Sequence, residues 1–319
     1  MMPEQSVLNK KRVKMKVSVI IPLRNAEPFI GRCLDSIVSQ SHQEMEIIVV
    51  DDKSTDASLS IVEKYAKQHS ALRVIRHDYC TGTMTCRCDG YQAATGECLL
   101  FVDADDTLPQ DAIAKLVELQ EQTGADIVTG NAVKICQNGR QETLTDALPA
   151  QVGVEDFLEA MIDGKARYSL WGRLYRTALF QKHELWHMDN MMVYEDACLL
   201  FQALEFAKKL SFADVPVYEY HENRKGSSLR TMGRREMESF IVANKVISDV
   251  CLPYARIADK TKCRISRNLF ALYGGKVSLS KLNYMLEKYD MRKFTTIRAA
   301  FKYLRFSDFV RLVKRRFSF

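Results

Sequence analysis

The sequence lacks long apolar segments and is poor in proline and glycine. Seven prolines and 14 glycines in 319 residues, with no internal repeat, exclude a low-complexity chain. No apolar run approaches the ~20 residues that a membrane-spanning helix needs. The first 16 residues are polar and basic, so we expect no secretory signal peptide. A composition of 47% hydrophobic and 27% charged residues predicts a soluble globular protein of one large or two modest domains.

A disulfide framework is also absent. The nine cysteines are an odd number without disulfide-like spacing, and several lie in apolar runs. We therefore expect reduced thiols and a cytoplasmic protein. Cys86-Arg87-Cys88 resembles half of a zinc site, but no second close pair of Cys or His accompanies it, so zinc is disfavoured.

The glycine-rich loops that bind phosphate are missing too. After the first predicted strand the chain continues Pro22-Leu23-Arg24-Asn25-Ala26-Glu27, and no glycine occurs before Gly31. A dinucleotide-binding turn needs glycines there so that the backbone can approach a pyrophosphate. No P-loop and no Gly-x-Ser-x-Gly segment is present either. Any bound phosphate must therefore be held by a metal ion and side chains.

Five apolar, β-branched runs predict a sheet. Because they are continuous rather than alternating, they indicate strands buried on both faces of a parallel sheet. Helical patterns separate them, for example over Ala57–His69 and Ala112–Gln120. The expected fold is an α/β sandwich, in which ligands bind beyond the carboxyl ends of the strands. The five runs are Val17–Ile21, Ile47–Val50, Leu72–Ile75, Cys98–Val102 and Asp126–Val128.

Polar residues gather at those strand ends, and the most informative group is Asp103-Ala104-Asp105-Asp106. Three carboxylates within four residues would repel one another unless a hard cation such as Mg²⁺ or Mn²⁺ bound them. The competing interpretation is an Asp-rich cap before a helix that Pro109 opens. Further acidic or polar groups follow the other strands, which favours a binding site: Arg24-Asn25, Asp51-Asp52 and His77-Asp78.

The pattern changes after about residue 130. Asn138-Gly139 predicts the turn of a hairpin within 131–145. Helices are expected near 154–162, 195–208 and 236–250, with a short strand at Val215–Tyr220, and the last 80 residues read as mostly helical.

Several ordered motifs resemble those of family 2 glycosyltransferases. A weaker similarity continues through Trp171-Gly172-Arg173-Leu174-Tyr175-Arg176, Glu195-Asp196-Ala197 and Tyr218-x-Tyr220. The strong motifs cover residues 16–130: Val17-Ser18-Val19-Ile20-Ile21-Pro22-x-x-Asn25, Cys33-Leu34-Asp35-Ser36-Ile37-x-x-Gln40, Glu46-Ile47-Ile48-Val49-Val50-Asp51-Asp52-x-Ser54-Thr55-Asp56, Gly96-Glu97 and Phe101-Val102-Asp103-Ala104-Asp105-Asp106.

The resemblance implies a GT-A fold, a Rossmann-like and mostly parallel sheet, and inverting transfer of a sugar from a nucleotide diphosphate, usually uridine. It implies four segments: a basic segment 1–15, a nucleotide-sugar half 16–130, an acceptor half 131–235 and a helical extension 236–319. It also implies roles by position. Pro22 and Asn25 would lie beside the nucleotide, Asp52 would accept a hydrogen bond from uracil, and Arg87 would lie near the base. Asp103 would face the ribose, and Asp105 would bind Mn²⁺ or Mg²⁺. Asp196 would be the catalytic base.

The remaining candidates are less constrained. Glu195-Asp196 also fits a helix N-terminus, and because helical neighbours point about 100° apart, we expect only one of the two to face the site. Trp171 is either a core residue or a platform for an acceptor sugar. His221 and Arg224 are candidates for binding the diphosphate.

The chain departs from the family pattern at three positions. Arg24 stands where the family usually has Tyr, Lys53 where it usually has Gly, and Cys88 where it usually has Asn.

The charge is concentrated at the C-terminal end. Residues 292–319 hold nine Lys or Arg and one Asp, which leaves 46 − 9 = 37 basic against 40 − 1 = 39 acidic residues elsewhere. An amphipathic stripe, Phe306, Phe309, Val310, Val313 and Phe317, is flanked by Lys314 and Arg316. It predicts attachment to an anionic membrane surface on the inner face of the plasma membrane, near a lipid-linked glycan acceptor. The alternative is a helix docked on the domain.

Nucleic-acid binding is not expected, since the body is slightly acidic. Two rival functions are considered. A sugar-phosphate nucleotidyltransferase would need a glycine-rich basic loop after the first strand, which is absent. A non-catalytic nucleotide- or glycan-binding relative would not need Asp103, Asp105 and Asp196, which are all present.

Overall fold

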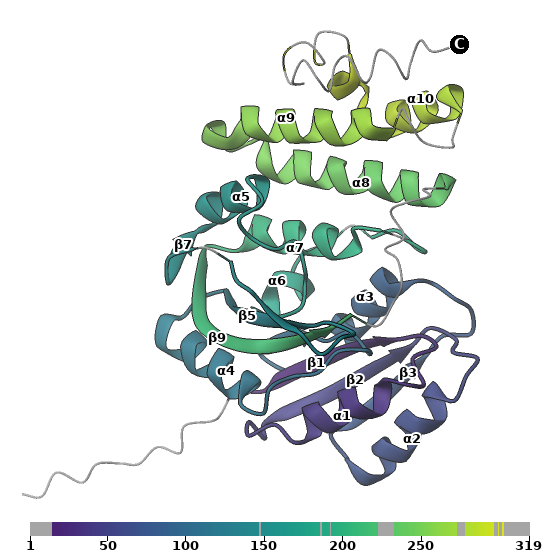
Figure 1. The fold of residues 1–319 in the computed structure, drawn as a ribbon, viewed down its shortest axis with the longest axis vertical. Coiled ribbons are helices and arrows are strands. Elements are labelled where there is room, and N and C mark those ends of the chain that lie inside the picture. Colours follow the sequence, from purple (N-terminus) through teal and green to yellow (C-terminus); the bar gives the residue numbers. More distant parts are fainter. Residues whose placement is uncertain are drawn as a thin grey trace, which may run out of the picture.

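The computed structural model describes residues 15–146, 148–185, 187–191, 193–222, 233–272, 278–296, 299 and 302. Within these ranges one sheet of nine strands forms the centre of the molecule, in the order β3-β2-β1-β4-β8-β5-β9-β7, with β6 paired to β5. Helices cover both of its faces, and further helices stack above them (Figure 1). The expected α/β fold is confirmed.

The first half of the sheet is parallel, as its apolar runs predict. Strands β1 (Val17–Leu23), β2 (Met45–Asp51), β3 (Leu72–Arg76) and β4 (Cys98–Phe101) run in one direction. Both faces are buried: Ile20 of β1 contributes to one hydrophobic core, and Val19 and Ile21 contribute to the other. This burial explains why the runs are apolar at every position rather than at alternate ones.

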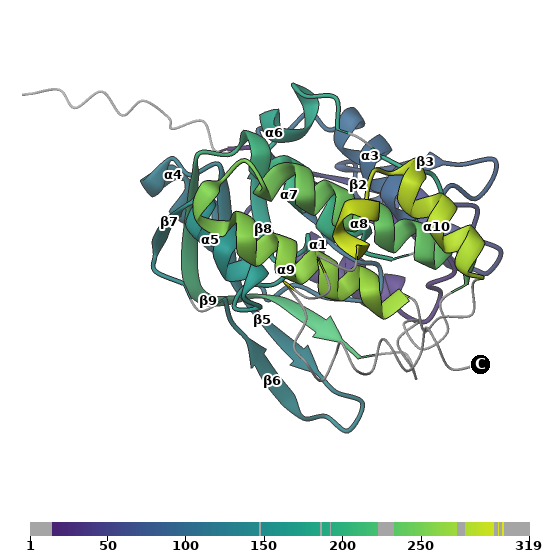
Figure 2. The ribbon, with the colours of Figure 1, turned by 90° about the horizontal axis from the view of Figure 1, so that it is seen from above.

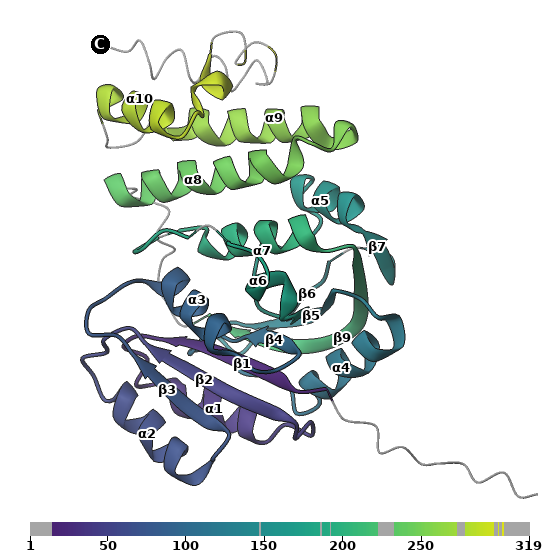
Figure 3. The same cartoon turned by 180° about the vertical axis from the view of Figure 1, so that it is seen from behind.

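Three helices connect these four strands and cover the two faces of the sheet. The helices α1 (Ile30–Val38) and α2 (Ser58–Gln68) lie on one face, and α3 (Thr83–Ala93) lies on the other (Figures 1 and 3). The helix α4 (Ala112–Thr123) leads into the second half of the sheet and ends at Gly124, in a left-handed C-cap. The helices expected at Ala57–His69 and Ala112–Gln120 are thus present with small changes at their ends.

The second half of the sheet contains an antiparallel insertion. β8 (Arg173–Arg176) lies between β4 and β5 (Ile127–Ile135) and is antiparallel to both. The sequence did not predict β8, because a four-residue strand with arginine at both ends shows no apolar run. β5 also pairs with β6 (Gln141–Leu144) in the expected hairpin, whose turn contains Gly139 at φ 80°.

Strand β9 (Lys209–His221) is longer than the strand expected at Val215–Tyr220. It runs parallel to β5, and β7 (Gln151–Gly153) pairs with β9 in the antiparallel direction. Because strands before and after residue 130 share one sheet, the two predicted halves meet inside it, and their boundary stays a prediction. Figure 2 shows the β5–β6 hairpin projecting beyond the helical layers.

The helices after residue 150 form successive layers. α5 (Val154–Ile162), α6 (Ala178–Gln181) and α7 (Glu195–Phe206) lie next to the sheet, and α8 (Arg234–Cys251), α9 (Ala255–Ala271) and α10 (Leu279–Lys288) lie beyond them (Figures 1 and 3). Buried side chains of α7, α8 and α9 join the same core as α3. A 3₁₀ turn, Arg292–Thr295, follows α10. The layered helices fix the first turn of α7 above the sheet.

In the described ranges no helix combines the length and apolarity required to cross a bilayer. The amphipathic stripe 306–317 and Arg224 lie outside the described residues. All nine cysteines lie within them, and none of the nine forms a disulfide, as expected.

Candidate active site

The Asp103–Asp106 segment follows β4, and β9 holds it in place from the other side of the site. The Tyr218 hydroxyl donates to Asp106 Oδ2 at 2.7 Å and accepts from the Asp103 backbone N–H at 3.1 Å. The backbone N–H of His221 donates to Asp106 Oδ1 at 2.8 Å. Asp106 is therefore a buried structural anchor, whereas the Asp103 side chain is 31% exposed and faces the site.

Arg87 on α3 is the buried centre of the site. Its side chain is only 2% exposed, because α3 packs closely on β1. One terminal nitrogen donates to Asp103 Oδ1 at 2.8 Å. The other lies 2.5 Å from Asp196 Oδ1 and 3.6 Å from Glu195 Oε1. One guanidinium thus joins carboxylates from the end of β4 and from the start of α7.

The two carboxylates at the start of α7 both reach this guanidinium. Tyr194, at φ 63°, turns the chain into the helix, and Leu170 N–H donates to Asp196 Oδ2 at 3.1 Å. Our expectation that only Glu195 or Asp196 would face the site was wrong. In the first helical turn both side chains lie beside a long arginine that reaches across from α3.

The electrostatics of this cluster are unbalanced toward negative charge. Burial alone would lower the pKa of Arg87, but the charges of Asp196, Asp103 and Glu195 outweigh it and raise that pKa above its ordinary value. Burial raises the pKa of Asp103 and of Glu195, and the charge of Asp196 raises both further. Three carboxylates share one guanidinium, so an additional cation would be stabilised here.

The sequence resemblance placed Arg87 near the nucleotide base, but the described partners of its guanidinium are the carboxylates of Asp103, Glu195 and Asp196. The base-side candidate Asp52 lies instead against the loop that precedes α3. Its carboxylate accepts from Thr81 N–H at 2.6 Å and from Gly82 N–H at 3.0 Å. Those bonds lower the pKa of Asp52 against the opposing effect of burial.

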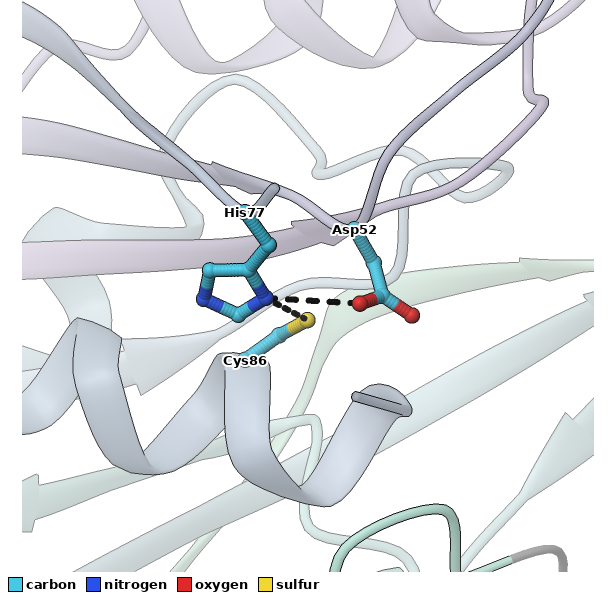
Figure 4. A group of neighbouring side chains, drawn as sticks. All are labelled: Asp52, His77 and Cys86. Atoms are coloured by element: carbon cyan, nitrogen blue, oxygen red, sulfur yellow. Dashed lines mark hydrogen bonds and ion pairs between the residues drawn. The ribbon is translucent and has the colours of Figure 1, made fainter. Parts of the chain in front are cut away.

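Figure 4 shows Asp52 together with His77 and Cys86, whose ligand atoms lie within 4.8 Å of one another. His77 Nδ1 lies 3.3 Å from Asp52 Oδ1 and 3.9 Å from Cys86 Sγ, and its Nε2 lies 2.8 Å from Asp89 Oδ2. Thr81 Oγ1 already bonds both Asp52 and His77 Nδ1. Burial raises the pKa of the Cys86 thiol to about 12. Asp52, Thr81, His77 and Asp89 thus form a hydrogen-bonded network beside the Cys86 thiol.

The remaining nucleotide-side candidates lie at the ends of β1 and β2. Pro22 is within β1, and Asn25 follows it at φ 47°. The Asn25 side chain accepts from Thr55 N–H at 2.8 Å, and its backbone N–H donates to Ser54 Oγ at 3.1 Å. Lys53 adopts φ 58°, the left-handed conformation that favours glycine. The departure from the usual glycine therefore keeps the backbone shape of the loop and adds a cation.

Two further candidates are Trp171, just before β8, and His221, at the end of β9. Trp171 stacks on Tyr218 at a ring-centroid distance of 4.5 Å and on Tyr220 at 5.8 Å, and the Arg167 guanidinium lies 5.5 Å from its ring centre. His221 Nε2 lies 2.9 Å from Thr107 Oγ1. The roles predicted for Trp171 with an acceptor and for His221 with a diphosphate stay predictions.

The comparisons with known proteins agree with this geometry. The family model described as Glycosyl transferase family 2 matches residues 18–185. The chain belongs to that family. It is 31% identical to the uncharacterized glycosyltransferase EpsJ of Bacillus subtilis over 211 residues, 65% of this chain and 61% of EpsJ. It is 30% identical to a poly(ribitol-phosphate) beta-glucosyltransferase of Bacillus spizizenii over 219 residues, 67% of this chain and 33% of the relative.

The fold is also that of a solved family structure. Staphylococcus aureus TarS 1–349 in complex with UDP-GlcNAc superposes with a TM-score of 0.72 at 22% identity, over 95% of this chain and 88% of TarS 1–349. This likeness shows the GT-A fold of the chain. The matched segment spans about 60% of EpsJ and 33% of the glucosyltransferase, so both relatives extend well beyond it.

Sequence reasoning missed the family 2 residues that hold the site together. Tyr218 was noticed only as part of a motif, and Asp106 only as one of the clustered acids. Part of the signal was present, because a tyrosine hydroxyl on a buried strand needs a hydrogen-bond partner, but the sequence does not distinguish Asp106 from Asp103 and Asp105 as that partner. The carboxylate oxygens of Asp103 and Asp105 fit the hard-ligand preference of Mn²⁺ or Mg²⁺, and the negative surplus around Arg87 favours such an ion.

Proposed function

We propose that this family 2 protein transfers a sugar from a nucleotide diphosphate, most simply a UDP-sugar, to a hydroxyl of a glycan or lipid-linked acceptor, with inversion. The observation that carries the proposal is the shared guanidinium of Arg87, which brings the donor-side carboxylate Asp103 next to the base candidate Asp196. TarS, which has the same fold, was solved with UDP-GlcNAc, which supports a uridine donor.

The residues divide the chemistry between them. Asp105 would hold Mn²⁺ or Mg²⁺, which supplies charge stabilisation for the departing nucleotide diphosphate, and Asp103 would face the ribose. Asp196 would accept the proton of the acceptor hydroxyl as the new glycosidic bond forms. A single displacement needs one base and no second catalytic carboxylate. Glu195, whose pKa is raised by burial and by the charge of Asp196, would contact the acceptor.

The acceptor would lie over the aromatic stack that starts at Trp171. The stack is built on β9 and borders Arg167, so its position is fixed by the sheet. An aromatic face of this kind is suited to the apolar face of a sugar ring. On the donor side, Pro22, Asn25 and Asp52 would border the nucleotide, and His221 and Arg224 would approach its diphosphate.

The test is release of UDP from a panel of UDP-sugars, with Mn²⁺ and then with EDTA. We expect one donor to be consumed in a metal-dependent manner, faster when an acceptor extract is added. Release of pyrophosphate from a nucleoside triphosphate and a sugar phosphate would instead identify a nucleotidyltransferase. Binding of UDP without turnover of any donor would identify a non-catalytic relative.

We also propose that the amphipathic stripe 306–317 attaches the protein to the inner face of the plasma membrane. Lys314 and Arg316 flank its apolar residues, a pattern typical of interfacial helices. The full chain should sediment with anionic vesicles and not with neutral ones, and Lys314→Glu with Arg316→Glu should release it. Equal recovery in the supernatant with both vesicle types would contradict attachment.

A further inference from the structure

The Arg87 guanidinium takes no part in the chemical step proposed so far, although it lies buried between the carboxylates of the site. Its side chain is 2% exposed, and neither its Nε nor the terminal nitrogen that faces Asp196 makes a hydrogen bond among the described residues, so the contact with Asp196 is an ion pair. The guanidinium is therefore held in place by its acidic neighbours, which are Asp103 at 2.8 Å, Asp196 at 2.5 Å and Glu195 at 3.6 Å.

Asp196 is held from two sides. Its Oδ1 lies against Arg87, and its Oδ2 accepts from the backbone N–H of Leu170 at 3.1 Å. An ion pair at Oδ1 and a hydrogen bond at Oδ2 hold the carboxylate from two sides and restrict its rotation. A base whose rotation is restricted can direct one lone pair at an acceptor hydroxyl, whereas a freely rotating side chain at the start of a helix cannot.

We propose that Arg87 is a positioning residue, which orients Asp196 toward the acceptor and ties that orientation to the donor-side carboxylate Asp103. The proposal rests on the proposed function, since it assumes that Asp196 is the base. It assigns Arg87 to the reaction centre rather than to the nucleotide base, where the family resemblance placed it.

The chemistry of arginine suits this position. A planar guanidinium presents donors in a fixed fork and can bond two carboxylates at once, whereas a lysine ammonium is a single point charge. The two carboxylates come from different elements, the end of β4 and the start of α7, so the fork also sets the spacing between those elements. A lysine at position 87 would keep the charge but not both contacts.

The experiment compares Arg87→Lys, Arg87→Ala and the control Arg76→Met in UDP release from the donor that the panel identifies. Arg76 is exposed at the end of β3 and pairs with Glu63 of α2, not with the carboxylates around Arg87. We expect kcat to fall about 100-fold for Arg87→Ala, as for a misplaced catalytic group, with a change in donor KM below about tenfold. Arg87→Lys should fold and remain well below the Arg76→Met control in kcat.

Added guanidinium chloride at concentrations that leave Arg76→Met folded and active should restore kcat of Arg87→Ala at least about tenfold, because a free guanidinium ion can occupy the vacated position. Rescue of this kind does not follow from a merely structural role. A rise in donor KM with unchanged kcat would overturn the proposal and return Arg87 to the nucleotide base. So would wild-type kcat in Arg87→Lys.

These measurements distinguish failure of the proposed glycosyl transfer from failure of the positioning role of Arg87. If wild-type protein consumes no donor, the proposed function fails, and the Arg87 variants are not interpreted. If wild-type protein is active and Arg87→Ala matches Arg76→Met, only the positioning role fails. If Arg87→Ala does not fold, Arg87→Lys decides the matter through its kcat.

Discussion

Two buried ion clusters in this protein have opposite charge balances. In the acidic cluster, Arg87 is shared by Asp103, Glu195 and Asp196, whose side chains are 31%, 24% and 22% exposed. In the basic cluster, Asp146 is shared by Arg167 and Arg173, and the Asp146 and Arg173 side chains are 1% and 0% exposed. The first cluster opens to solvent on its carboxylate side, and the second is closed.

The clusters also differ in the groups that surround their surplus charge. In the basic cluster the surplus is met by backbone carbonyls: Arg167 donates to Gly130 O at 2.6 Å, and Arg173 donates to Arg167 O at 3.0 Å and to Ser169 O. In the acidic cluster the surplus is negative and faces the surface. A closed cluster with carbonyl partners stabilises the fold, whereas an open acidic surplus is suited to binding a cation and a substrate.

The largest expected effect is on the acidic cluster. Asp196→Asn removes the proton acceptor and keeps the shape of the side chain, so kcat should fall by about 10²- to 10⁴-fold. Binding of UDP in the presence of Mn²⁺ should change little, because Asp196 is not assigned to the donor. Steady-state kinetics and calorimetry on the same preparation check both statements. Retained turnover would show that another group, with Glu195 the first candidate, is the base.

The basic cluster should respond in stability. Asp146→Asn leaves two buried arginines with a neutral partner, and we expect it to lower the free energy of unfolding by about 3 kcal/mol at pH 7. Burial alone would raise the pKa of Asp146, but the charges of Arg173 and Arg167 outweigh it and hold that pKa below its ordinary value.

The sign of the pH dependence follows from this lowered pKa. The ionised Asp146 stabilises the fold above the unfolded-state pKa of about 3.9, and this contribution is lost as the pH falls through the lower folded-state value. The stability difference between wild type and Asp146→Asn should therefore shrink below about pH 4. Urea unfolding at several pH values measures it, and a difference that stays constant would contradict the assignment.

The smallest effect is expected at Tyr218, which links β9 to the segment Asp103–Asp106. Tyr218→Phe removes the hydroxyl that donates to Asp106 and accepts from Asp103 N–H, two buried contacts. We expect a loss of about 1–2 kcal/mol in unfolding free energy, measured by urea unfolding. Donor KM should rise as well, since Asp103 loses its backbone anchor. A stability change without any change in KM would show that Asp103 keeps its position unaided.

The fold was largely predictable from sequence because its strands are buried on both faces. Continuous apolar runs marked β1 to β5, and Asn138-Gly139 marked the hairpin. The sequence did not predict β8 because two of its four residues are arginines. One of them, Arg173, is fully buried because it forms an ion pair with Asp146. Periodicity does not detect a strand that is stabilised in this way.

The site was predictable in its residues but not in its connections. Asp103 and Asp196 were identified by motif, yet their link through Arg87 depends on how closely α3 packs on β1, where a Cβ on Gly90 would lie 2.4 Å from Ile20 Cγ2. Tertiary packing of this kind leaves no local pattern. Lys53 shows the converse case, since a departure from the expected glycine keeps the expected left-handed backbone.

The measurement that tests the account most directly is calorimetric titration of UDP into the purified full-length protein, with Mn²⁺ and then with EDTA, for wild type and Asp105→Ala. The account predicts that wild-type protein binds UDP with Mn²⁺, and that both EDTA and Asp105→Ala abolish or strongly weaken binding. UDP binding of equal strength in all three conditions would contradict it, because the acidic segment after β4 would then not be the cation-dependent donor site.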